Sequence, residues 1–338
     1  MSSKQTQDDS RIVSRRDFTL LGGGAAVAGL AGCLDDDDDP GNDGTAQATG
    51  DDEPLEIAVA AAMPAVWDLT RQVGGEHAEA FDVVPTGEHG HDYSAGTGDV
   101  EDIEDADAFV YLRDFAGWID DFVAAHEDGD TVEVIDASAD IDFFDSPVED
   151  NDEHWWLDPI AAKDGVDNIV DGLSELNPDH ADEFEANGEA FKEELDDIDE
   201  QFHDVVDRAE LDTAVVATHN SFGWWIDRYG VEVVSPFGIT PDSEASASEI
   251  EEIQNTIEEL GIDYILYDLG EPTTAAESIA AETGAEILPL SPIETQLDGS
   301  PNIGFPDGRE LNMTPDWGYV EHFEEINLPA LEFALRAE

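Results

Sequence analysis

The stretch NPDHADEFEANGEAFKEELDDIDEQFHDVVDR, residues 177–208, decides the fold expected of this chain. Asn177 is a favourable helix cap, and Pro178 suits the first helical position. Five apolar residues then recur at spacings of 7, 4, 3 and 4, which places them on one helix face: Phe184, Phe191, Leu195, Ile198 and Phe202. Beyond Pro178, only Gly188 could act as a hinge. The stretch therefore predicts one stiff helix of about 30 residues, long enough to span a small domain.

Strand and helix patterns alternate on both sides of this helix. Before it, strands are expected at 57–62, 108–112 and 132–136, and helices at 64–73, 99–105 and 115–126, with a further helix that starts near residues 158–159. After it, strands are expected at 213–218, 231–235, 264–268 and 286–290, and helices at 222–229, 248–260, 273–283 and 321–336. Alternation of this kind predicts parallel sheets covered by helices. The fold class is therefore α/β, with two lobes that each hold a parallel sheet flanked by helices and are joined by one long rigid helix.

The first 33 residues have the pattern of an export signal. Arg15 and Arg16 form a twin-arginine start, and the apolar run 18–31 is shorter than the about 20 residues that a membrane span needs. The run ends at Leu-Ala-Gly-Cys33, which resembles a lipoprotein processing box and contains the chain's one cysteine. We expect Cys33 to become a lipid anchor after twin-arginine export, with the protein tethered to the outer face of the cell membrane. An uncleaved signal anchor is the alternative.

The remaining boundaries follow from composition. Residues 34–54 are rich in aspartate and poor in apolar residues, which predicts a disordered acidic tether. We expect an N-terminal α/β lobe at 55–176, the connecting helix at 177–208 and a C-terminal α/β lobe at 209–338.

The net charge of −73, from 85 acidic and 12 basic residues, excludes nucleic acid and anionic membrane surfaces as partners. Self-repulsion of this size destabilises a compact state at ordinary ionic strength. At about 1 M salt the screening length falls to about 3 Å, and most of that repulsion disappears. The composition therefore predicts a protein adapted to molar salt.

Three histidines, each within a distinct motif, form the candidate site. His91 lies in Gly-Glu-His-Gly-His-Asp-Tyr, His154 in Glu-His-Trp-Trp-Leu-Asp-Pro and His219 in Ala-Thr-His-Asn-Ser-Phe-Gly. His219 follows a strand directly, at the end where open α/β sheets bind ligands. Neutral imidazole is the commonest side-chain metal ligand, so metal capture is the leading hypothesis. The other six histidines are interpreted as ordinary surface or core residues, with His89 the weakest case: His77, His89, His126, His180, His203 and His322.

These motifs resemble those of the solute-binding proteins of zinc and manganese ABC importers. The family phrase Asn-Pro-His-Val-Trp-Leu-Asp-Pro is matched by residues 152–159, and His-Asp-Ala-Phe-Gly-Tyr by residues 219–224. The Asp-Pro-His loop is matched more loosely around His91. The resemblance covers nearly the whole chain after the tether. It implies two α/β lobes joined by a rigid helix, with metal in the cleft between them, and His91, His154 and His219 as ligands.

One departure concerns the fourth ligand. The family usually has an aspartate in a late Leu-Asp-Pro phrase, where this chain has Ser291. A neutral hydroxyl substitutes poorly for a charged oxygen ligand. Asp268, which ends its strand and matches a family glutamate, is expected to replace it, with Glu271 second and a water third. Asp268 could equally support a ligand from behind rather than bind metal.

The resemblance implies an extracellular receptor, not an enzyme, that delivers a divalent metal to an ABC-transporter permease and acts as a monomer. Three imidazoles favour Zn²⁺ over Mn²⁺, which prefers oxygen-rich sites. A manganese receptor of the same family and a metal-dependent adhesin are the alternatives. A zinc hydrolase is disfavoured because no His-Glu-x-x-His motif is present. Four tryptophans beside the candidate ligands are expected to pack along the cleft: Trp155, Trp156, Trp224 and Trp225.

Overall fold

The computed structural model describes residues 57–126, 131–146, 151–237, 246–301 and 303–337. The expected export signal, the acidic tether and Cys33 lie outside these ranges. Within the described residues, none of the helices is both long enough and apolar enough to span a bilayer.

A four-stranded parallel sheet forms the N-terminal lobe. Its strands are β1 (Ile57–Ala61), β2 (Ala78–Asp82), β3 (Ala108–Tyr111) and β4 (Glu133–Asp136), arranged in the order β2-β1-β3-β4. Val59 of β1 pairs with Ala80 of β2 and with Ala108 of β3, which fixes the register at the centre of the sheet. Three helices connect these strands: α2 (Pro64–Gly74), α3 (Thr97–Asp105) and α4 (Gly117–His126). The small apolar residues of β1 and β3 are buried, as expected where helices cover a parallel sheet.

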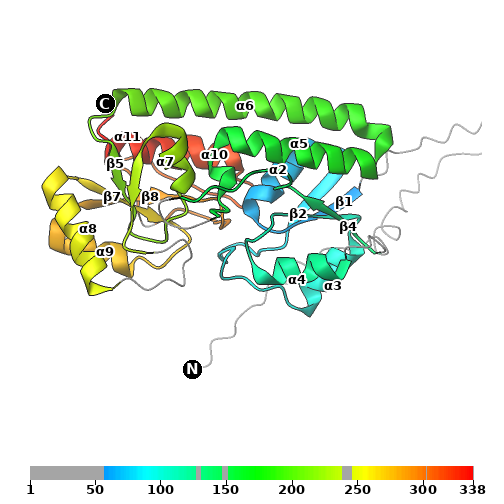
Figure 1. Cartoon of the computed structure of the whole chain (residues 1–338), viewed down its shortest axis with the longest axis horizontal. Coiled ribbons are helices and arrows are strands. Elements are labelled where there is room, and N and C mark those ends of the chain that lie inside the picture. Colours follow the sequence, from blue (N-terminus) through cyan, green and yellow to red (C-terminus); the bar gives the residue numbers. More distant parts are fainter. Residues whose placement is uncertain (1–56, 127–130, 147–150, 238–245, 302, 338) are drawn as a thin grey trace, which may run out of the picture. The chain divides into compact units, whose positions relative to one another are not determined.

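The C-terminal lobe repeats this arrangement with shorter strands. β5 (Thr213–Val215) pairs in parallel with β6 (Glu232–Val234), and β7 (Tyr264–Asp268) pairs in parallel with β8 (Glu286–Leu290). A parallel bridge between Val216 and Leu266 places β5 beside β7. The helices of this lobe are α7 (Gly223–Tyr229), α8 (Ala247–Leu260) and α9 (Thr274–Thr283). The expectation of two α/β lobes with parallel sheets is confirmed (Figure 1).

The long helix α6 (Ala181–Arg208) runs beside α5 (Pro159–Leu176), as Figure 1 shows. The predicted start at Asn177 is four residues early, because Pro178–His180 form a 3-10 turn. The five residues of the predicted apolar face are at most 3% exposed. Gly188 permits the close approach of the two helices, since a Cβ there would lie 2.6 Å from Val170 Cγ2. The uninterrupted helix is thus confirmed, and its glycine serves packing rather than bending.

Two other elements differ from the sequence expectation. Strand β2 was not predicted, since Ala-Glu-Ala-Phe-Asp has little apolar character and only Ala78 of it is buried at the sheet edge. The expected helix 321–336 is divided into α10 (Tyr319–His322), a π-helical turn (Phe323–Asn327) and α11 (Leu328–Ala334). Such turns often occur at functional sites. Here the turn places Asn327, whose amide bonds both backbone groups of Ser291.

The apolar core is continuous between the lobes. One cluster of buried residues includes the N-terminal sheet, the inner faces of α5 and α6, and Trp225, Tyr319 and Phe323 of the C-terminal half. A second cluster lies between β5, β7 and the helices α8 and α9. The lobes are therefore joined by packed side chains as well as by α6.

Candidate metal centre

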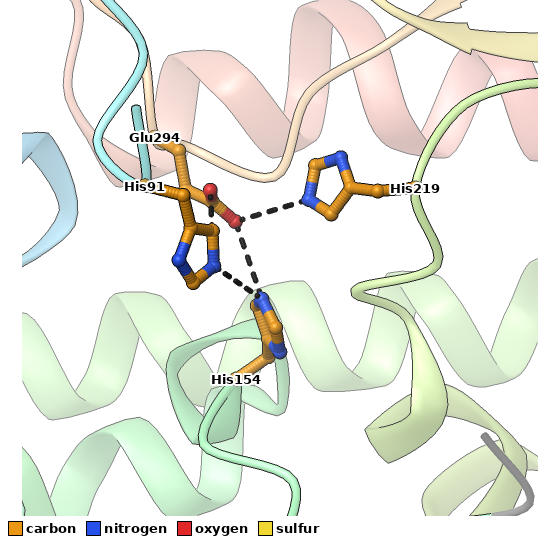
Figure 2. A group of neighbouring side chains, drawn as sticks. All are labelled: His91, His154, His219 and Glu294. Atoms are coloured by element: carbon orange, nitrogen blue, oxygen red, sulfur yellow. Dashed lines mark hydrogen bonds and ion pairs between the residues drawn. The ribbon is translucent and has the colours of Figure 1, made fainter. Parts of the chain in front are cut away.

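The three predicted histidines converge on one buried centre together with Glu294 (Figure 2). His91 is in the loop after β2, and His154 precedes the 3-10 turn Trp155–Leu157. His219 follows β5 and Glu294 follows β8. One nitrogen or oxygen of each side chain lies within 4.8 Å of all the others. Two groups thus come from the N-terminal half and two from the C-terminal half of the chain.

Four separations between these groups are close to the edge of a small coordination tetrahedron. His91 Nε2 lies 3.3 Å from His154 Nε2. Glu294 Oε1 lies 3.5 Å from His154 Nε2 and 3.6 Å from His219 Nε2, while Oε2 lies 3.6 Å from His91 Nε2. A tetrahedral zinc ion with ligands at about 2.0–2.1 Å separates them by roughly 3.3 Å. The arrangement therefore has the size of a four-ligand zinc site.

Buried atoms without hydrogen bonds also fit a cation. Both carboxylate oxygens of Glu294 and Nε2 of His219 are buried without a hydrogen-bond partner, and the Glu294 side chain is fully buried. An ionised carboxylate in such a place is destabilising unless a counter-charge compensates it. A divalent ion bound between the four groups would provide that charge and occupy the unpaired lone pairs.

The electrostatics of the centre are strongly coupled. Burial alone lowers the pKa of His154, but the hydrogen bond with Asp152 and the negative charge of Glu294 outweigh it and raise the pKa to about 9. His219 behaves likewise: burial is outweighed by Glu271 and Glu294, which raise its pKa well above the usual value. Burial would raise the pKa of Glu294, but four neighbouring imidazoles, His91 and His89 first and then His154 and His219, hold that pKa well below the usual value. Glu294 is therefore ionised, and a cation entering the centre would displace protons from imidazoles.

His91, the remaining histidine of the centre, behaves differently. Burial lowers the pKa of His91 to about 3, against the attraction of Glu294. Its ring packs on Phe115, with 4.1 Å between the ring centroids. A neutral His91 is in the protonation state that a metal ligand needs.

Carboxylates behind two of the rings fix their orientation. Asp152 Oδ1 lies 3.0 Å from His154 Nδ1, and Glu271 Oε1 contacts His219 Nδ1. Because an ionised carboxylate only accepts hydrogen bonds, each Nδ1 carries a proton, and once a cation displaces the second proton of each ring, Nε2 presents its lone pair to the centre. Such partners raise the basicity of a metal-binding imidazole.

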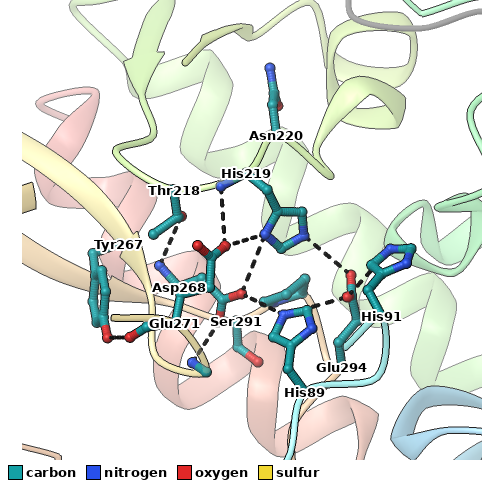
Figure 3. A network of polar contacts seen from close by, with 12 residues as sticks. His89, His91, Thr218, His219, Asn220, Tyr267, Asp268, Glu271, Ser291 and Glu294 are labelled. Carbon is teal, nitrogen blue, oxygen red and sulfur yellow. Dashed lines mark hydrogen bonds and ion pairs between the residues drawn. The ribbon is translucent and has the colours of Figure 1, made fainter. Parts of the chain in front are cut away.

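Glu294, rather than the expected Asp268, faces the three Nε2 atoms. Asp268 Oδ2 lies on the other side of the His219 ring, 3.8 Å from Nδ1 (Figure 3). This placement favours the alternative that Asp268 supports a ligand from behind. Ser291, which replaces the family aspartate, turns away, and its Oγ lies 2.8 Å from His322 Nδ1. The sequence signal for Glu294 is its place in the same loop, three residues beyond Ser291.

Local backbone geometry aims Glu294 at the centre. Ile293 is fully buried with a φ of 61°, a conformation that a β-branched residue rarely adopts. Gly90 N donates to Glu294 O at 2.9 Å, and Gly87 N donates to Gln296 O at 2.8 Å. The loop that holds His91 and the loop that holds Glu294 are therefore joined backbone to backbone.

The remaining predicted features have mixed outcomes. The four tryptophans are buried, each at most 8% exposed. Trp156 packs against the His154 ring, and its Nε1 donates to Pro292 O at 2.8 Å. His77 and His180 stack with an interplanar angle of 15°, so their lone pairs do not converge. His89, interpreted as an ordinary residue, is instead buried beside Asp268, with His89 Nε2 3.3 Å from Asp268 Oδ2. Its early position in the same loop as His91 was the signal that it belongs to this region.

Comparison with known proteins gives a consistent result. The family described as "ZnuA: Zinc-uptake complex component A periplasmic" matches residues 59–305 of this chain. The zinc-binding protein AdcA of Streptococcus pyogenes serotype M1 is 29% identical over 252 residues, which cover 68% of this chain and 49% of AdcA. The chain thus spans about half the length of that relative.

Two solved structures share the fold at 26% identity. One is the Zn(II)-bound ZnuA-like domain of Streptococcus pneumoniae AdcA, with a TM-score of 0.67 over 83% of this chain and 99% of that one. The other is the laminin-binding protein Lmb of Streptococcus agalactiae, described as having adhesin and metal-transporting activity, with the same TM-score and coverage.

Proposed function

Because the chain belongs to the ZnuA family of periplasmic zinc-uptake components, we propose that it is an extracellular receptor that captures one zinc ion and delivers it to the permease of an ABC importer. The observation that carries this proposal is the convergence of His91, His154, His219 and Glu294 on one buried centre. The family description is that of an uptake component rather than an enzyme, which agrees with the prediction that the chain is not an enzyme.

The ligand chemistry supports zinc as the cargo. Three imidazole nitrogens and one carboxylate oxygen suit Zn²⁺, whereas Mn²⁺ favours sites richer in oxygen. AdcA of Streptococcus pyogenes is named a zinc-binding protein, and the AdcA domain of similar fold is Zn(II)-bound. A manganese receptor of the same family remains the alternative that a competition experiment separates.

A second candidate function is adhesion. The similarity to Lmb, which is described as both an adhesin and a metal transporter, favours it. The two functions are compatible, since a metal-loaded receptor on the cell surface can also present a binding face. The buried four-group centre still makes metal capture the primary function.

The location follows from the first part of the chain. We propose export of a folded, monomeric protein through the twin-arginine signal, and attachment to the outer face of the membrane through Cys33. Residues 34–54 would then act as the tether for the N-terminal lobe (55–176), the connecting helix (177–208) and the C-terminal lobe (209–338). Radiolabelled lipid incorporation, compared between the wild-type chain and Cys33→Ser, tests the attachment.

Metal binding provides the direct test of the function. Titration of the untagged, metal-free chain in molar salt is expected to give saturable one-to-one binding of Zn²⁺, followed by tryptophan emission. Trp156 lies 5.0 Å from the His154 ring, centroid to centroid, so its emission should report occupation. Excess Mg²⁺ suppresses adsorption to the acidic surface, and competing Mn²⁺ tests selectivity. A preference for Mn²⁺ would change the cargo, and no specific binding of either ion would leave adhesion as the function.

Salt dependence of stability is a further expected result. The midpoint of thermal unfolding of the metal-free chain should fall steeply as KCl is lowered from about 3 M to about 0.1 M, because screening of the −73 net charge is lost. Differential scanning fluorimetry measures the midpoint. An equal osmolarity of sucrose serves as the control, since it favours compact states without screening charge. A midpoint independent of salt would contradict adaptation to molar salt.

A further inference from the structure

His219 has a different set of neighbours at each ring nitrogen. Its Nε2 faces Glu294 at 3.6 Å, within the centre already described. Its Nδ1 contacts Glu271 Oε1 and lies 3.8 Å from Asp268 Oδ2 (Figure 3). His89, His219, Asp268 and Glu271 offer ligand atoms that all lie within 4.8 Å of one another. A second four-group set thus adjoins the first and shares one ring with it.

His89 links the two sets. Its Nε2 lies 3.6 Å from Glu294 Oε2, the same distance that separates His91 Nε2 from that oxygen. It also lies 3.3 Å from Asp268 Oδ2. The side chain is 4% exposed, and Nδ1 is buried without a hydrogen-bond partner. His89 is therefore a buried imidazole whose hydrogen bonding is incomplete, placed between two carboxylates.

The surrounding loop is built to hold this ring. A Cβ at Gly270 would lie 3.0 Å from His89 Cδ2 and would also overlap Thr295 Oγ1, so the backbone there approaches the ring as only glycine allows. Gly270 N donates to Asp268 Oδ1 at 2.8 Å, which leaves Oδ2 directed at His89 and His219. The positions of His89 and Asp268 are thus set by packing and by the backbone.

Buried carboxylates border both sets. Four carboxylates border the two sets and are at most 12% exposed: Asp152, Asp268, Glu271 and Glu294. In the described part of the chain, no lysine or arginine forms an ion pair with any of them. Their ion-pair partners are histidines, chiefly His89, His154 and His219, so a divalent ion at either set would replace the protons that these imidazoles carry. Carboxylates placed around both sets therefore suit one cation that occupies the two sets in turn.

We propose a second divalent-metal position bounded by His89 Nε2, His219 Nδ1, Asp268 Oδ2 and Glu271 Oε1, through which the captured ion passes. The proposal rests on the proposed receptor function. A neutral imidazole has one lone pair, so His219 serves one ion at a time and the two positions are occupied in alternation. Two nitrogen and two oxygen donors make the second position weaker for zinc than three nitrogens and one oxygen. Glu271 is 12% exposed and Glu294 is fully buried, which places the second position nearer to solvent.

Cobalt binding to a variant of the first centre tests the proposal. The full chain carrying His154→Gln is titrated with Co²⁺ in molar salt, and the visible absorption bands report coordination. The variant is expected to retain one bound ion, with Kd raised about 100-fold over the wild type. Adding His89→Gln to this variant should raise Kd at least about 10-fold more and change the bands. This factor should exceed the one that His89→Gln causes in the wild-type background, where it removes only a neighbour of Glu294. His203→Gln, at a histidine whose side chain is 51% exposed, is the matched control and should have no effect in either background.

The outcomes separate this proposal from the receptor function. Equal small effects of His89→Gln in both backgrounds, or no cobalt retained by His154→Gln, would overturn the second position while wild-type binding still supported the receptor. No binding by the wild-type chain would instead overturn the receptor function. Circular dichroism in molar salt checks folding, and His91→Gln provides a second way to disable the first centre if His154→Gln fails to fold.

Discussion

Replacing Glu294 with glutamine is expected to weaken zinc binding by about 10² to 10³-fold, because it removes the one negative charge that faces all three imidazoles. Glu294 is fully buried and its oxygens lie 3.5–3.6 Å from the ring nitrogens. Breaking a buried charge pair on one side costs about 3–5 kcal/mol, and the lower part of that range, about 3–4 kcal/mol, corresponds to this loss of affinity. Glutamine keeps the shape of the side chain, so the change reports charge rather than packing. Competitive titration with a zinc chelator of known affinity measures the loss.

Two comparisons make the Glu294 result specific. Glu286→Gln, at an exposed position on the strand that leads to the same loop, should leave the affinity unchanged. Asp268→Asn should weaken zinc binding less than Glu294→Gln, because Asp268 Oδ2 faces His219 Nδ1 rather than Nε2. A larger loss for Asp268→Asn than for Glu294→Gln would restore Asp268 as the fourth ligand.

Replacing Gly223 with alanine is expected to lower zinc affinity by about 10- to 100-fold although it removes no ligand. A Cβ on Gly223, the first residue of α7, would overlap Asp152 Oδ2 and lie 2.7 Å from Ser146 Cβ. Asp152 must then move, and its hydrogen bond with His154 Nδ1 is lost or bent. Losing the partner behind a ligating histidine typically has an effect of about this size. Overpacking should also destabilise the metal-free chain by about 1–3 kcal/mol.

The control for this variant is Gly117→Ala. Gly117 begins α4, and a Cβ there would have no neighbour within 4 Å, so neither affinity nor stability should fall. Zinc titration and thermal unfolding of the metal-free chain measure the two effects separately. A destabilised Gly223→Ala chain with wild-type affinity would show that Asp152 does not tune His154.

The parts of the fold that sequence reasoning predicted are those with strong periodicity or strong end signals. The apolar spacing from Phe184 to Phe202 predicted α6 because every one of those residues enters the core. Strands β7 and β8 have the bounds that their apolar runs predicted. Strand β2 was missed because an edge strand needs few apolar residues, and its pairing with β1 is set by the neighbouring strand rather than by its own sequence.

Of the candidate site, the three histidines were predicted because their local sequence identifies them, whereas Glu294 and His89 were not. His91, His154 and His219 each lie in a recognisable sequence motif, and the fold brings these three motifs together. Glu294 has no such phrase. Its direction depends on the positive φ of Ile293, a conformation that nothing in the local sequence announces. His89 was discounted because its neighbours Asp268 and Glu271 are about 180 residues away along the chain.

The continuous core between the lobes has a consequence for the rate at which a bound ion is released. Receptors that open on a free hinge exchange cargo with solvent at a rate set by their own fluctuations. In this chain the two halves share packed residues from the N-terminal sheet to Phe323, and the loops of His91 and Glu294 are joined by backbone hydrogen bonds. Spontaneous opening must break these contacts, so we expect a long residence time for the ion in the unaccompanied receptor. Under the proposed receptor function, release would then depend on a partner that separates these two loops, and the bound ion would remain in the centre until that partner binds.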